Sequence, residues 1–100
     1  MKSKILTCLF MLLASTAMFA QRVTVTGTVK DAIGPVIGAS VIEKGTTNGA
    51  TTDLDGKYSI SVPANAVLEF KSIGYATQEI AVAGKSVIDV ILAEDAEFLD

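Results

Sequence analysis

Apolar and polar side chains alternate with a period of two from Arg22 to Leu92, and this alternation constrains the fold more than any other feature. Successive side chains of a β-strand point to opposite faces of the sheet, so the pattern predicts strands with one buried face. No stretch has the period of an amphipathic helix. Residues that favour turns interrupt the alternation about every eight to twelve residues, which is typical of short strands joined by tight connections. The sequence therefore predicts an all-β domain.

Seven strands are expected from this pattern. Their predicted ranges are 22–29, 38–44, 50–52, 57–62, 67–72, 77–82 and 86–92. Short turns between sequential strands imply antiparallel pairing, because parallel neighbours need longer crossover connections. About seven short strands in roughly 80 residues are typical of a Greek-key β-sandwich, and a domain of that size can fold alone.

Two turns carry specific backbone predictions. The dipeptide Asn48-Gly49 predicts a tight hairpin, because both residue types tolerate a positive φ. Gly74 lies in a bend with Tyr75 and is expected to hold backbone angles that other residues avoid. Gly74→Val should therefore destabilise the fold.

Residues 1–20 have the pattern of a secretory signal peptide that is cleaved on export. Lys2 and Lys4 precede an apolar run from Ile5 to Ala14, and small residues lead to the favoured cleavage position after Ala20. Cleavage after Ala17 remains open, because it places a small serine rather than Met18 three residues before the cut. The apolar run is shorter than the roughly 20 residues that a transmembrane helix needs.

The only cysteine, Cys8, lies near the start of that apolar run rather than at the cleavage point, which argues against a lipid anchor. The mature chain then has no cysteine and no histidine, so it lacks disulfides and the commonest acid–base catalyst and metal ligand. Without the two lysines of the signal, six basic residues remain against eleven acidic ones. A nucleic-acid surface needs a cationic patch, and this acidic chain has none.

The sequence offers no recognisable catalytic machinery. Asp53-Leu54-Asp55-Gly56 superficially resembles the start of a calcium loop, but the twelfth position, where an EF-hand has glutamate, is Ala64. We interpret this segment as a β-turn in which aspartate accepts backbone hydrogen bonds and glycine takes the positive φ. Using the two aspartates as paired glycosidase carboxylates would require a cleft, for which a small aliphatic-filled domain has little room.

Serines and threonines are plentiful, but none lies in a nucleophile motif, and glycine-rich phosphate loops are absent. We therefore predict no catalytic, cofactor-binding or metal-ligating residues, no cofactor and no enzyme activity. The aromatic residues Tyr58, Phe70 and Tyr75 are expected to pack in the core. Ala93–Asp100 leaves the alternation and carries four acids in its last seven residues. The predicted organisation is a signal peptide at 1–20, a sandwich domain at 21–92 and an acidic linker at 93–100.

Several segments, in this order, closely resemble the carboxypeptidase-regulatory-like domain, a transthyretin-like sandwich. They are Thr26–Val29, Gly34–Val41, Lys44–Gly49, Thr52–Tyr58 and Ile73–Tyr75. With Val62-Pro63-Ala64 and the ending Val90–Asp95, the chain resembles the N-terminal extension of SusC/RagA-type TonB-linked outer-membrane receptors. The resemblance covers Val23 to about Asp100.

In that family the domain lies in the periplasm, before a TonB box, a plug and a barrel that imports glycans or peptides. The resemblance therefore implies a non-catalytic accessory domain or fragment, associated with the outer membrane, that acts by contact with the receptor's plug and barrel or with the TonB complex. The given chain ends before any such box. No membrane span is expected in the mature chain, because a transmembrane barrel needs at least eight strands of about nine to eleven residues, more than this length can supply. One alternative is a stand-alone exported sandwich that binds carbohydrate or peptide, although the chain has no tryptophan to stack on a sugar. The other alternative, a small hydrolase, is disfavoured by the missing histidine.

Overall fold

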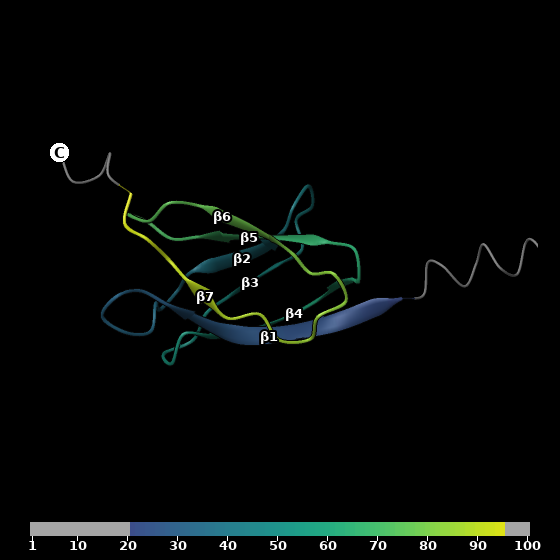
Figure 1. Cartoon of the computed structure of the whole chain (residues 1–100), viewed down its shortest axis with the longest axis horizontal. Helices are drawn as coiled ribbons and strands as arrows, with labels where there is room; N and C mark the ends of the chain where they lie inside the picture. Colours follow the sequence, from purple (N-terminus) through teal and green to yellow (C-terminus); the bar gives the residue numbers. More distant parts are fainter. Residues whose placement is uncertain (1–20, 96–100) are drawn as a thin grey trace, which may run out of the picture.

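The computed structural model describes residues 21–95 (Figure 1). All regular structure in this part of the chain is β-strand, and it contains no helix that is long and apolar enough to cross a membrane. The predicted signal peptide and the last five residues of the predicted linker lie outside the described residues. The strands are β1 (Arg22–Lys30), β2 (Ser40–Glu43), β3 (Gly49–Thr51), β4 (Lys57–Pro63), β5 (Val67–Lys71), β6 (Gln78–Ala81) and β7 (Val90–Ile91).

The seven strands form two sheets that face each other as the layers of a sandwich (Figure 1). One sheet has three strands in the order β4-β1-β7, and the other has four in the order β3-β2-β5-β6. Only β2–β3 and β5–β6 are hairpins between consecutive strands, and both are antiparallel. The remaining four connections cross from one sheet to the other, so a single core is enclosed between the layers. The predicted all-β sandwich is confirmed.

The pairing of β7 differs from the expectation of antiparallel strands throughout. β7 runs parallel to β1, with Val29 opposite Val90 and Lys30 opposite Ile91. The expectation came from tight turns between consecutive strands, but about sixty residues separate these two strands. Strand β6 belongs to the opposite sheet, so the chain enters the three-stranded sheet with no short turn to fix its direction. The prediction of antiparallel pairing is therefore wrong for this pair.

A close approach between backbones explains why β7 is shorter than the predicted 86–92. Gly27 lies against the backbone of Ile88, and a Cβ at this position would be 1.9 Å from the Ile88 carbonyl oxygen. The Tyr58 hydroxyl donates to that same oxygen (2.6 Å), and the Thr28 amide donates to the Asp89 carboxylate (2.9 Å) instead of a strand partner. An isolated parallel bridge joins Thr26 to Val87, but at the Ile88 carbonyl and at Asp89 side chains take the place of ladder hydrogen bonds, so regular β7 begins at Val90.

The core lies between the inward faces of the two sheets. Tyr58 of β4 and Phe70 of β5 meet edge to face across it, with ring centroids 5.5 Å apart and an interplanar angle of 74°. Both are buried, as expected, and burying a side chain of this size stabilises a fold by about 2–3 kcal/mol. Burial, together with the nearby Asp89 carboxylate, raises the pKa of Tyr58 to about 12. The other inward residues are aliphatic: Val25, Val29, Val36, Ala39, Val41, Ile60, Val62, Leu68, Val82, Ile88, Val90 and Leu92.

The β2–β3 connection lies where it was expected, but its geometry differs. The Glu43 amide donates to the Asn48 carbonyl (2.9 Å), so the turn consists of the residues between them, and the positive φ belongs to Gly45 (83°). Gly49 is already part of β3, and neither it nor Asn48 has a positive φ. The Asn48 side chain donates to the Ser61 carbonyl on β4 (2.8 Å), which anchors it as a bridge between the sheets. The predicted Asn-Gly turn geometry is therefore wrong.

Candidate functional site

The two ends of the sandwich differ in which side chains they expose. We call one the apolar end; it consists of the loops 31–39, 52–56 and 72–77 and of residues 92–95, on the left of Figure 1. The opposite, polar end consists of the connections 44–48, 64–66 and 82–86. Six large hydrophobic side chains are exposed in residues 21–95, and four of them lie on the three loops of the apolar end: Ile33 (94%), Ile37 (60%), Leu54 (79%) and Ile73 (90%). The other two, Val87 and Ile91, lie beside β1, so the polar end exposes none.

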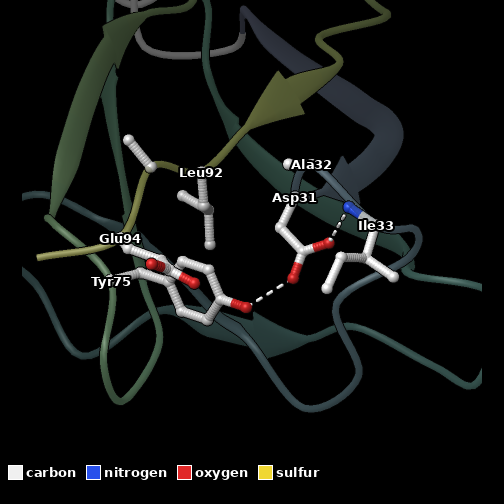
Figure 2. A pocket seen from close by; sticks show the side chains of 7 residues that line it. Asp31, Ala32, Ile33, Tyr75, Leu92 and Glu94 are labelled. Atoms are coloured by element: carbon white, nitrogen blue, oxygen red, sulfur yellow. Dashed lines mark hydrogen bonds between the residues drawn. The ribbon is translucent and has the colours of Figure 1, made fainter. Parts of the chain in front are cut away.

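Asp31 organises the first loop of the apolar end. Its carboxylate accepts hydrogen bonds from the amides of Ile33 (2.8 Å) and Gly34 (2.9 Å), which turns the chain immediately after β1. Its other oxygen accepts a hydrogen bond from the Tyr75 hydroxyl, which ties this loop to the bend between β5 and β6 (Figure 2). The Tyr75 hydrogen bond and the two amides lower the pKa of Asp31, and the same hydrogen bond, with some burial, raises the pKa of Tyr75. Asp31 therefore stays ionised and serves as an acceptor.

Thr52 fixes the second half of the same loop by two hydrogen bonds. It is the buried polar residue of the described chain, with 5% of its surface exposed. Its hydroxyl donates to the Val36 carbonyl (2.6 Å) and accepts from the Ala39 amide (2.9 Å). Both partners are buried, so the backbone of this loop is fixed to the end of β3.

The chain leaves the described fold at the apolar end. The Ala76 amide donates to the Ala93 carbonyl (2.9 Å), the Asp95 amide donates to the Gly74 carbonyl (3.0 Å), and Tyr75 and Glu94 form a bridge between them. The first three residues of the predicted linker are thus hydrogen-bonded to the bend that precedes β6.

An open hollow of about 340 Å³ lies between this segment and the Asp31 loop (Figure 2). Its apolar lining comes from Ala32, Ile33, Leu92 and Ala93, and its polar lining from Asp31, Tyr75 and Glu94. Two carboxylates beside an aromatic ring can accept hydrogen bonds or attract a cation. Since the pKa of Asp31 is lowered and that of Tyr75 raised, neither group is poised to exchange a proton near neutral pH.

The Asp53–Gly56 segment is a β-turn, as predicted. One carboxylate oxygen of Asp53 accepts hydrogen bonds from the amides of Asp55 and Lys57 (both 2.9 Å), and Gly56 has a φ of 75°. These amides, Lys57 first, lower the pKa of Asp53. Among residues 21–95 no group of three or more potential ligands is placed to hold a metal ion.

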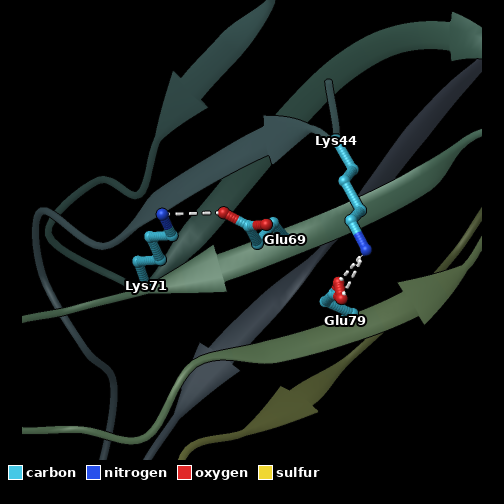
Figure 3. A network of polar contacts seen from close by, with 4 residues as sticks. All are labelled: Lys44, Glu69, Lys71 and Glu79. Atoms are coloured by element: carbon cyan, nitrogen blue, oxygen red, sulfur yellow. Dashed lines mark hydrogen bonds and ion pairs between the residues drawn. The ribbon is translucent and has the colours of Figure 1, made fainter. Parts of the chain in front are cut away.

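The outer face of the four-stranded sheet carries two ion pairs (Figure 3). Glu69 and Glu79 lie directly opposite each other on β5 and β6, an arrangement in which like charges repel. Lys71 contacts Glu69 (2.8 Å) and Lys44 contacts Glu79 (2.7 Å), so each carboxylate has a cation of its own. The Glu79 hydrogen bond and charge raise the pKa of Lys44. Exposed pairs of this kind contribute little to stability, and we regard this face as ordinary sheet surface.

Sequence reasoning missed the Asp31–Tyr75 contact and the hollow beside it. Tyr75 was expected in the core, and it does pack against the core as a half-buried residue, but its hydroxyl reaches outward to Asp31. The one available signal was the Asp31-Ala32-Ile33-Gly34 sequence, which is typical of an aspartate that accepts bonds from the following amides. Its link to Tyr75 joins residues 44 positions apart and leaves no local pattern.

The sequence matches several TonB-dependent receptors. It is 48% identical over 83 residues to the TonB-dependent receptor SusC of Bacteroides thetaiotaomicron, a match that covers 82% of this chain and 8% of the receptor. Two TonB-dependent receptors of Formosa agariphila match at 46% over 78 residues and at 40% over 95 residues, covering 76% and 92% of this chain. The chain spans only 8 to 10% of the length of these relatives.

Solved structures share the fold at low sequence identity. Two crystal structures of a type II cohesin–X-dockerin complex from Acetivibrio cellulolyticus, an N-terminal and a C-terminal interface mutant, match with TM-scores of 0.61 and 0.60. Each match covers 72% of this chain and 58% of the other at 23% identity, so the likeness concerns the fold alone. The model of the CarboxypepD_reg-like domain matches residues 25–100. The chain thus belongs to the CarboxypepD_reg-like domain family.

Proposed function

We propose that this chain is a non-catalytic accessory domain of a SusC/RagA-type TonB-dependent receptor. In this proposal it is exported through the signal at 1–20, lies in the periplasm at the outer membrane, and supports glycan or peptide uptake by protein–protein contact. The contact is with the plug or barrel of the receptor or with the TonB complex. The observation that carries the proposal is the identity of 40 to 48% to three TonB-dependent receptors over most of the chain.

The geometry of the described residues supports contact rather than catalysis. Asp53 and Asp55, the candidate carboxylates, belong to a turn in which Asp53 is already bonded to backbone amides. The feature that stands out is a set of exposed aliphatic side chains on the loops at one end, which hydrogen bonds of Asp31, Thr52 and Asp53 hold in place. We take this end as the candidate contact surface, because gathered exposed apolar side chains are a feature of interaction sites.

The coding sequence beyond Asp100 gives the first test. Continuation into a valine-rich box and many amphipathic strands is the expected result, because the relatives are about ten times as long as the matched segment. A stop codon directly after Asp100 would refute the receptor assignment.

Deletion of residues 23–92 from the receptor then tests the contact function. Substrate uptake and TonB binding are measured in cells with the amount of receptor in the outer membrane equalised by immunoblot. We expect reduced uptake, because the domain's contacts are lost while the transport apparatus remains. Normal uptake together with normal TonB binding would refute a functional contact.

Direct binding of a small sugar or peptide is the second candidate, and the hollow favours it. Tyr75 lines this hollow between the carboxylates of Asp31 and Glu94, which is a polar and aromatic combination able to hold hydroxyl or amino groups. Isothermal titration of the chain against glycan and peptide panels should give heat that Tyr75→Ala abolishes. If no compound of either panel gave a heat of binding, this candidate function would be eliminated.

A further inference from the structure

The exposed aliphatic side chains of the apolar end are held outward by their own loops. Asp31 fixes the backbone on either side of Ile33, and Thr52 fixes the backbone on either side of Ile37. Ile73 belongs to the bend that Tyr75 ties to Asp31. Reorienting the backbone at Ile33 or Ile37 toward the core would break those hydrogen bonds. The exposure of these two side chains, 94% and 60%, is therefore supported by the conformation of their loop.

The charges of the two ends are of opposite sign. Apart from the internal Lys71–Glu69 pair, the apolar end carries five carboxylates and two lysines: Asp31, Asp53, Asp55, Glu94 and Asp95 against Lys30 and Lys57. With the internal Lys44–Glu79 pair left out in the same way, the polar end carries two cations and one carboxylate: Arg22 and Lys85 against Glu43. The apolar end thus combines aliphatic and acidic groups, and its complement is a surface with aliphatic side chains and lysine or arginine.

The path of the chain indicates where such a surface is found. Residues 93–95 are bonded along 74–76, so the chain leaves the sandwich beside Ile73 and the hollow. Under the proposed function the receptor continues beyond residue 100, so the part that follows starts within a short distance of the apolar end. A short connection gives a high effective concentration of the two surfaces, which favours even a modest contact.

We propose that the apolar end is the docking surface of this domain, and that it binds a basic and aliphatic face of the part of the receptor that follows in the same polypeptide. This inference rests on the proposed function and deepens it by naming the surface and the occupant. The polar end, in this arrangement, faces away from the rest of the receptor.

Cysteine labelling of the full-length receptor tests the inference, because residues 21–100 contain no natural cysteine. Single variants Ile33→Cys and Ile73→Cys report on the apolar end, and Thr47→Cys and Lys85→Cys, at exposed positions of the polar end, are the matched controls. The rate of maleimide modification is measured in membranes for each variant. We expect modification at the apolar end to be at least tenfold slower than at the controls, and to approach the control rates in 1 M NaCl with mild detergent.

Equal rates at both ends would overturn the inference, as would slow modification at the polar end alone. A second set of receptors combines Ile33→Ser and Ile73→Ser with Thr47→Cys. An unchanged rate of maleimide modification at position 47 would confirm that the receptor still folds when the apolar end is altered. Failure here is distinct from failure of the proposed function. Equal labelling rates in a receptor whose uptake depends on residues 23–92 would reject this surface and leave the accessory role standing.

Discussion

The polar and apolar ends of the sandwich perform the same structural task, yet they are built differently. Both ends use positive φ values, at Gly45, Ala83 and Gly84 of the polar end and at Gly38, Gly56 and Gly74 of the apolar end, but the side chains of the polar turns are small, polar or charged. At the apolar end a buried hydroxyl and a carboxylate hold long loops, and aliphatic side chains project from them. Turning the chain does not require exposed isoleucine, as the polar end demonstrates. The exposed isoleucines of the apolar end are therefore not explained by the need to turn the chain.

The largest expected difference between the ends concerns two glycines with similar backbone angles. A Cβ on Gly56 would be 2.5 Å from the Val29 carbonyl oxygen and 3.0 Å from Pro35, whereas nothing lies within 4 Å of a Cβ on Gly45. Gly56→Ala should cost about 3 kcal/mol or more, because backbone strain and a clash with backbone atoms add together. Gly45→Ala should cost about 1–2 kcal/mol from strain alone. Urea unfolding measures the loss of stability in each variant. Equal losses would show that the loops of the apolar end adjust to an added Cβ as easily as those of the polar end.

The next comparison uses two threonines that make the same pair of bonds in different surroundings. Thr52 and Thr46 each donate to a carbonyl and accept from an amide, but Thr52 is buried and Thr46 is exposed. Thr52→Val should cost about 2–3 kcal/mol, because the buried Val36 and Ala39 groups lose their partner and gain no water. Thr46→Val should cost less than about 1 kcal/mol, since water replaces the hydroxyl. Hydrogen exchange at the Ala39 amide should accelerate only in the first variant.

Gly74 and Gly84 allow the cost of backbone strain to be measured without a steric clash. Both have positive φ values, 89° and 73°, and a Cβ on either would meet no atom within 4 Å. Gly74→Val and Gly84→Val should each cost about 1–2 kcal/mol from left-handed strain. Only Gly74→Val should also expose the Asp95 amide to hydrogen exchange, because that amide bonds to the Gly74 carbonyl. An unchanged melting temperature in Gly74→Val would mean that the bend tolerates a branched side chain.

The alternation predicted most of the sheet framework because strand formation here follows local sequence. β1, β4 and β5 begin and end within one residue of the expected positions. β7 was predicted as seven residues and has two, since its path is set by the contact of Gly27 with Ile88, 61 positions along the chain. The exposed side chains of the apolar end could not be predicted from the sequence for the same reason. In the sequence, an isoleucine beside a glycine indicates a turn but not the direction of its side chain. The outward direction of Ile33 and Ile37 depends on the hydrogen bonds of Asp31 and Thr52.

The smallest effect concerns the pH dependence of the contact between Asp31 and Tyr75. The folded pKa of Asp31 lies below its ordinary value of 3.8, with the Tyr75 hydrogen bond as the largest cause. The unfolded chain thus binds the proton more tightly, so this contact stabilises the fold above pH 3.8, and its contribution disappears as the pH falls through the folded pKa. Tyr75→Phe should move the pKa of Asp31 upward but leave it below 3.8, because the amides of Ile33 and Gly34 still donate.

Carbon-detected NMR titration of the Asp31 carboxylate, with urea unfolding at pH 7 and pH 2, checks both statements. The stability difference between wild type and Tyr75→Phe should be present at pH 7 and shrink as the pH falls through the folded pKa of Asp31. Thr46→Val, at the polar end, should leave the Asp31 titration unchanged. If Tyr75→Phe also left it unchanged, the hydroxyl would not bond to Asp31 in solution. The apolar end would then lack the contact that joins two of its loops, and the bend that carries Ile73 would no longer be tied to the Asp31 loop.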